Sequence, residues 1–86
     1  MQLMQIIERA KAQLAKATGM EPLITPAASR DGDGWRVTVE VVELHRIPEA
    51  QDVIGVYDVQ MSDAGELLEW RRMGMRRRDD TEWSAE

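Results

Sequence analysis

The chain has 86 residues, of which 43% are apolar and 31% charged, with a formal net charge of −5 and no cysteine. This length corresponds to one small domain with little room for an enclosed catalytic pocket, and the lack of cysteine excludes disulfides, thiolate metal sites and cysteine nucleophiles. The negative charge is concentrated in residues 35–70, which carry two basic and eight acidic groups, and such an acidic body argues against a general nucleic-acid binder.

Residues 2–18 are predicted to form an amphipathic helix. The apolar stripe that a helix requires is made by Leu3, Ile6, Ile7, Ala10, Leu14 and Ala17. Gly19 follows where a left-handed C-cap would lie, and Lys16 in the last turn suits the helix dipole. The sequence contains neither a continuous apolar signal segment at its start nor a run of about 20 apolar residues, so we expect a cytoplasmic protein without a membrane span.

Residues 19–34 are predicted to be a linker. The segment contains Pro22 and Pro26 and ends in a tight turn over residues 31–34. Any extended piece within residues 23–28 would be confined to a sheet edge, because proline lacks the backbone N–H that a central strand needs.

Three strands are predicted next, at residues 35–44, 53–61 and 66–73, with residue 75 as an alternative end of the last one. In the first, Trp35, Val37 and Val39 alternate with polar residues at the period of two that marks a strand. The alternation breaks at residues 41–42, which predicts a bulge or a strand end there. Glu43 has the parity of the inward-facing residues. Residues 62–65 are predicted to form a hairpin turn.

Together these elements predict an α+β fold, in which one N-terminal helix packs on one face of a three-stranded antiparallel β-sheet. A single domain would span residues 1–78, with the sheet at residues 35–75 and a polar tail at residues 79–86. One helix covers only one sheet face, so the other face would remain bare. We expect that face to carry Arg36, Thr38, Glu40, Asp58 and Gln60.

Candidate chemistry is sparse, and we expect no catalytic residue, metal or cofactor. His45 is the single histidine, and a metal site would need it to converge with Glu40, Glu43 or Asp52, whereas an exposed imidazole at a strand end is the simpler interpretation. The glycines of the 31–34 turn precede a strand and not the helix N-terminus that a phosphate-binding loop requires.

An arginine run is the strongest candidate interaction site. The predicted partner-binding residues are Trp70, Arg71, Arg72, Arg76, Arg77, Arg78 and Trp83. The guanidinium groups suit carboxylates, either of the acidic body or of a protein partner. Contact with nucleic acid, helped by base stacking on Trp70, is the alternative, and the acidic balance of residues 35–70 favours the protein partner.

Segments distributed over residues 34–78 carry a family resemblance. In chain order they are Gly34–Val37, Val39–Glu43, Arg46–Pro48, Asp52–Val59, Asp63–Leu67 and Trp70–Arg72. This stretch, a little over half of the chain, resembles the gas vesicle protein O family, and the preceding helix that ends at Gly19 fits the family's usual layout.

The resemblance implies a cytoplasmic accessory protein of gas vesicle formation that acts in assembly or regulation and not in catalysis. The implied partners are other gas vesicle proteins, shell or accessory, and the bare sheet face and exposed edges also predict self-association. The working surface would be the bare sheet face together with the arginine edge. Two alternatives stay open: a regulator of vesicle gene expression that contacts nucleic acid through residues 71–78, and a small ligand-binding domain with an apolar pocket between helix and sheet.

Overall fold

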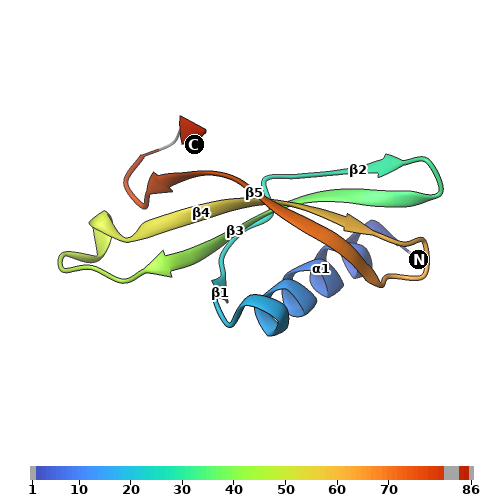
Figure 1. The fold of residues 1–86 in the computed structure, drawn as a ribbon, viewed down its shortest axis with the longest axis horizontal. Helices are drawn as coiled ribbons and strands as arrows, with labels where there is room; N and C mark the ends of the chain where they lie inside the picture. Colours follow the sequence, from blue (N-terminus) through green and yellow to red (C-terminus); the bar gives the residue numbers. More distant parts are fainter. Residues whose placement is uncertain (1, 81–83, 86) are drawn as a thin grey trace.

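The computed structural model describes residues 2–80 and 84–85, which form one helix and a twisted antiparallel sheet (Figure 1). The elements in chain order are α1 (Leu3–Thr18), β1 (Glu21–Pro22), β2 (Ala27–Asp31), β3 (Gly34–Leu44), a 3₁₀ turn (Glu49–Gln51), β4 (Val53–Met61), β5 (Leu67–Arg77) and β6 (Ser84–Ala85). The α+β class, the N-terminal helix and the antiparallel sheet are therefore as predicted.

Helix α1 has defined signals at both ends. At its start, the side chain of Gln5 accepts a hydrogen bond from the backbone N–H of Gln2 at 2.9 Å. At its end, Gly19 adopts φ 74° and donates its N–H to the carbonyl of Ala15 at 2.7 Å, the left-handed cap predicted from the sequence.

The prediction of three strands was wrong, because short strands extend the sheet on both sides. Strands β3, β4 and β5 form its centre in the order β1-β3-β4-β5-β6, and β2 pairs with β3 beside β1. Residues 21–22 and 27–31, predicted to be linker, are thus edge strands along β3. The sequence did not predict these strands because Pro22 and Pro26 interrupt the alternating pattern. An edge strand nevertheless tolerates proline. Ser84–Ala85, placed in the polar tail, pair with Met75 and Gly74 of β5.

Helix α1 lies against one face of the sheet (Figure 1), and the hydrophobic core fills the space between them. Its fully buried members are Ile6, Ala10, Leu14, Val37, Val39, Val41, Val59 and Met61. The register places Val37 opposite Val59 and Val39 opposite Tyr57, so both strands present the same parity to the helix. Because these side chains fill the space between helix and sheet, the structure does not favour the alternative of an apolar ligand pocket there.

The face opposite α1 is only partly bare, which corrects the expectation of an open sheet face. Near the β3–β4 connection, Glu40, Val42, Ile54 and Val56 on this face are all buried. Towards the other end, the side chains of this face stay exposed or half-buried; they are Arg36, Thr38, Asp58, Gln60, Glu69 and Arg71. The exposed part of this face is thus restricted to the end where β4 turns into β5.

Bulges shape the long strands. The predicted irregularity in β3 is a register shift between Val42 and Leu44. Strand β5 has two further shifts against β4, which leave Leu68 and Met73 without an opposing residue. A regular stretch of β5, residues 69–72, therefore lies between two bulges.

Candidate interaction surface

The arginine run lies on β5 and just beyond it, but its side chains go to different places. Alternation along the strand sends Arg72 to the helix face and Arg71 and Arg76 to the opposite face, as their pairing partners Tyr57, Asp58 and Ile54 indicate. The run is therefore not one basic patch.

Arg76 is committed to an internal ion pair with Glu40. Its guanidinium donates to both carboxylate oxygens of Glu40, at 2.7 and 3.0 Å, and the two side chains are only 12% and 7% exposed. Glu40 is on β3 and Arg76 on β5, so the pair spans the intervening strand β4 over Ile54 and Val56. The same guanidinium also donates to the carbonyls of residues 77, 78 and 80. The hydrogen bonds to the Glu40 carboxylate raise the pKa of Arg76 above its ordinary value.

Arg72 makes the corresponding pair on the helix face. It donates to both oxygens of Glu43 at 2.8 Å, and the hydroxyl of Tyr57 donates to the same carboxylate at 3.0 Å. The Glu43 side chain lies over Gly55, where an added Cβ would collide with it. The hydrogen bonds from Arg72, helped by Tyr57, lower the pKa of Glu43 against the opposing effect of burial.

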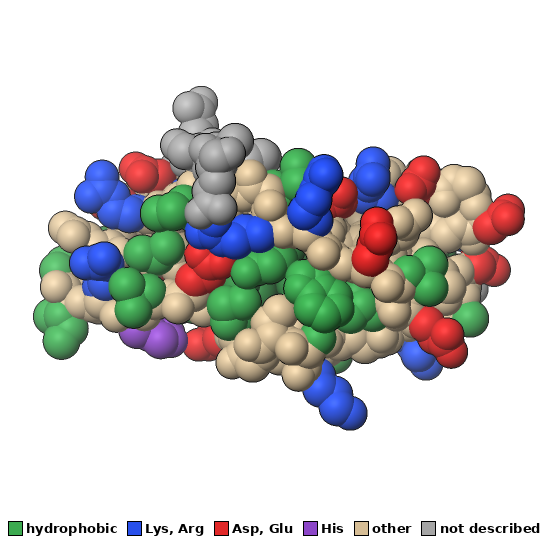
Figure 2. All heavy atoms as spheres, in the orientation of Figure 1, with side chains coloured by type: hydrophobic (Ala, Val, Ile, Leu, Met, Phe, Trp, Pro, Cys, Tyr) green, Lys and Arg blue, Asp and Glu red, His purple; other side chains and the backbone are tan. Residues whose placement is uncertain are grey.

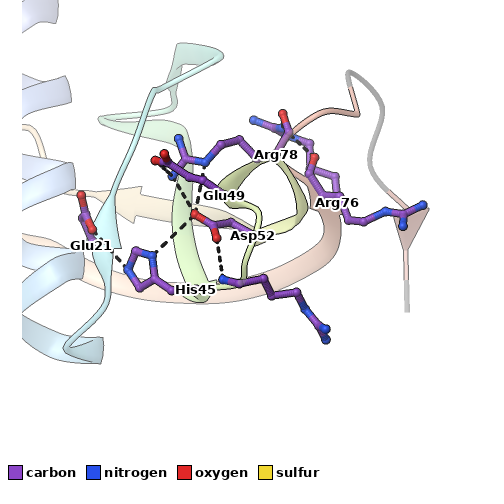
Figure 3. Close-up of polar contacts among 8 residues, drawn as sticks. Glu21, His45, Glu49, Asp52, Arg76 and Arg78 are labelled. Atoms are coloured by element: carbon purple, nitrogen blue, oxygen red, sulfur yellow. Dashed lines mark hydrogen bonds and ion pairs between the residues drawn. The ribbon is translucent and has the colours of Figure 1, made fainter.

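Arg78 belongs to a polar cluster around Asp52 (Figure 3). The Asp52 side chain is fully buried. The Asp52 carboxylate accepts the backbone N–H of Arg46 at 2.7 Å and faces the Arg78 guanidinium at 3.2 Å. His45 lies between Asp52 and Glu21, at 3.5 and 3.6 Å (Figure 3). The Arg46 hydrogen bond, followed by Arg78, lowers the pKa of Asp52 although burial raises it.

Asp52 thus ties the β3–β4 connection to the end of β5. Arg46 makes its contact with Asp52 through the backbone amide. No sequence pattern marked Asp52 as a buried residue, because nothing distinguishes it from the surface acids around it.

The lowered pKa values of Asp52 and Glu43 predict acid sensitivity. A carboxylate whose pKa is lower in the folded state stabilises the fold above its unfolded pKa of about 4, and this contribution is lost as the pH falls through the folded pKa. The urea midpoint should be nearly constant from about pH 7 to about pH 5 and should fall below about pH 4. Glu43→Gln should flatten this fall, and a midpoint unchanged down to about pH 3 would contradict the prediction.

Three further predicted residues, Trp70, Arg71 and Arg77, are exposed. Arg77 pairs only loosely with Asp80 at 3.7 Å, and Arg71 makes no ion pair within the described residues. Trp70 is 44% exposed and its neighbour Leu68 is 60% exposed. Trp83 lies outside the described residues. Sequence reasoning missed Leu68, which only the bulge in β5 turns outward.

Figure 2 shows how side-chain types are distributed over one face of the molecule. Hydrophobic side chains gather in its middle, and acidic ones gather at the end that holds the β2–β3 and β4–β5 turns. That end includes a hollow lined in part by Asp31, Asp33, Asp63 and Leu68. Arg30 pairs with Asp63 there at 2.7 Å and lowers the pKa of Asp63.

No three histidine, aspartate or glutamate side chains converge to hold an ion in the part of the chain that the structure describes. In residues 2–80 and 84–85, no helix combines the length and the apolar run that a bilayer crossing requires.

Comparisons with known proteins agree with the resemblance. Residues 1–82 match the family described as gas vesicle synthesis protein GvpO. A gas vesicle protein O of Streptomyces sp. (strain CB03234) is 40% identical over 70 residues, covering 81% of this chain and 55% of the relative. Gas vesicle protein O of Haloferax mediterranei is 45% identical over 49 residues, covering 51% of this chain and 35% of the relative.

A third relative, gas vesicle protein O1 of Halobacterium salinarum, is 36% identical over 53 residues, covering 62% of this chain and 44% of the relative. The aligned part of this chain thus spans about half or less of the length of these curated relatives. No solved structure matches the chain significantly.

Proposed function

The chain belongs to the gas vesicle synthesis protein GvpO family, and from this membership we propose that it is a non-enzymatic accessory protein that supports gas vesicle assembly through protein–protein contacts. It acts in the cytoplasm, in contact with other gas vesicle proteins of the shell or accessory kind. The observation that carries the proposal is the family match across residues 1–82.

The exposed part of β5 supports a role in protein contacts. Leu68 and Trp70 present apolar surface to solvent, and Arg71 is exposed on the opposite face of the same strand. Tryptophan and arginine are enriched where proteins bind each other. Exposed apolar side chains of this size lower the solubility of a protein, so we expect a partner to cover them.

A regulator that contacts nucleic acid is less well supported than it was from the sequence. Arg72, Arg76 and Arg78 are engaged with Glu43, Glu40 and Asp52, so their charges are already compensated within the chain. The remaining cations of the run, chiefly Arg71 and Arg77, belong to a chain of net charge −5. Two cations give little counterion release and therefore little affinity for phosphate backbones.

The test is deletion of the gene in a vesicle-forming host, followed by complementation. An assembly role predicts that vesicles disappear while vesicle-gene transcripts and the shell protein stay at normal levels. Complementation with Leu68→Ser/Trp70→Ser should restore few vesicles, whereas Met4→Ser, an exposed apolar residue on the helix, should restore them fully. Normal vesicles in the deletion strain would refute the proposal, and a fall in transcripts would establish the regulatory role instead.

A further inference from the structure

The outer side of β5 over residues 69–72 is a free strand edge in the described part of the chain. Strand β4 pairs with one side of β5, while on the other side β6 pairs only with Gly74 and Met75. Within the described residues, no strand pairs with the outer side of residues 67–73. An exposed strand edge presents unpaired N–H and C=O groups, which readily pair with a strand of another chain.

We propose that this edge pairs with the same edge of a second copy, in antiparallel orientation about a two-fold axis at Trp70. The proposal deepens the proposed role in protein–protein contacts by naming one partner, a second copy of this chain. Antiparallel edge pairing is self-complementary, as a two-fold interface requires.

Charge selects the register of this pairing. A two-fold axis perpendicular to the sheet places opposite one another residues that project from the same face. An axis at Glu69 would place Glu69 directly opposite Glu69 of the second copy, and an axis at Arg71 would do the same for Arg71. Like charges directly opposite one another destabilise a sheet. An axis at Trp70 instead places Glu69 opposite Arg71 of the second copy, and does so twice.

The side chains that this register would join are available in the monomer. Glu69 and Arg71 are exposed and share the face opposite α1. Asp58, which lies opposite Arg71 on β4, is instead engaged by Arg36 at 3.3 Å. On the helix face, Trp70 would meet Trp70 of the second copy and cover apolar surface that is 44% exposed in the monomer.

The bulges define how far the pairing extends. Leu68 and Met73 interrupt the regular stretch 69–72 on either side, so the axis at Trp70 uses a short segment of each copy. A contact of this size lies at the small end of specific interfaces, and we expect a dissociation constant of about micromolar order.

Charge exchange on the purified chain tests the proposal. Sedimentation equilibrium over about two decades of concentration around the micromolar range should show a monomer–dimer equilibrium. Glu69→Arg and Arg71→Glu should each weaken the dimer at least about tenfold, because each creates two like-charge pairs. The double variant Glu69→Arg/Arg71→Glu restores opposite charges and should regain most of the affinity. Glu8→Arg, the same change on the exposed face of α1, is the matched control and should have no effect.

Cysteine cross-linking gives a second readout that does not depend on charge. The chain has no cysteine, so a single introduced one can form only an intermolecular disulfide. Opposing residues of a sheet have Cβ atoms about 4.5–5.5 Å apart, close to the separation that a disulfide spans, so Trp70→Cys should cross-link on mild oxidation. Leu68→Cys is similarly exposed but lies about 13 Å from its own copy in this register, and it should remain unlinked.

Several results would overturn the proposal. These are a monomeric chain throughout the concentration range, a dimer insensitive to both charge reversals, a double variant no tighter than the single ones, or equal cross-linking at residues 68 and 70. Because these measurements use the purified chain alone, they are separate from the vesicle assay. A monomeric chain whose deletion abolishes vesicles would refute the dimer and leave the proposed function standing, and a dimeric chain dispensable for vesicles would do the reverse.

Discussion

Arg76→Met is expected to lower the free energy of unfolding by about 3 kcal/mol, because it leaves the buried carboxylate of Glu40 without its partner. A domain of this size has about 5–10 kcal/mol in total, so the variant would lose a large share of its stability. Urea denaturation followed by circular dichroism measures the loss. The guanidinium also donates to three backbone carbonyls after β5, so the chain end at residues 77–80 should loosen as well.

Two comparisons make the Arg76 prediction specific. Arg77→Met removes the neighbouring exposed arginine and should change the unfolding free energy by less than about 0.5 kcal/mol. The double variant Glu40→Val/Arg76→Met removes both charges and should be more stable than Arg76→Met alone, since no unpaired charge remains buried. A double variant as unstable as the single one would show that the ion pair is not the cause.

Leu14→Ala is expected to destabilise the protein by about 3 kcal/mol, because the side chain is fully buried between α1 and the sheet. The loss combines the transfer free energy of the removed methyl groups with the cavity left behind. Urea denaturation followed by circular dichroism measures it.

Met4→Ala is the matched control for the helix. Met4 is 65% exposed on the same helix, so its loss should change the unfolding free energy by less than about 0.5 kcal/mol. If Leu14→Ala cost no more than this control, α1 would not be the cover of the sheet face that the structure describes.

The engagement of the arginines decides how their role in binding can be tested. Reversing all five to glutamate would place negative charges against Glu40, Glu43 and Asp52 in partly or fully buried positions. Such a variant would lose partners because it unfolds. Arg71→Glu/Arg77→Glu alters only the exposed members of the run and is the variant with which partner binding is best examined.

Local sequence patterns were sufficient for the helix and the long strands. Apolar spacing and Gly19 defined α1, and alternation defined β3 and β4, because each signal comes from residues adjacent in the chain or one turn apart. The same alternation assigned Glu43 to the helix face and located the irregularity near Val42. The family followed from motif resemblance over residues 34–78 and did not depend on the fold.

Other features were decided only when distant segments met in the tertiary structure. Strands β1 and β2 exist because β3 offers an edge to a proline-containing segment that has little strand signal of its own. Arg76 finds Glu40 36 residues away, and Arg78 finds Asp52 26 residues away, so a run that looks like one basic surface is divided between internal pairs and solvent. Ion pairs depend on position in space, which residue order along a strand does not specify, and for that reason the sequence marked the arginines while the packed sheet determined which of them remain free to bind.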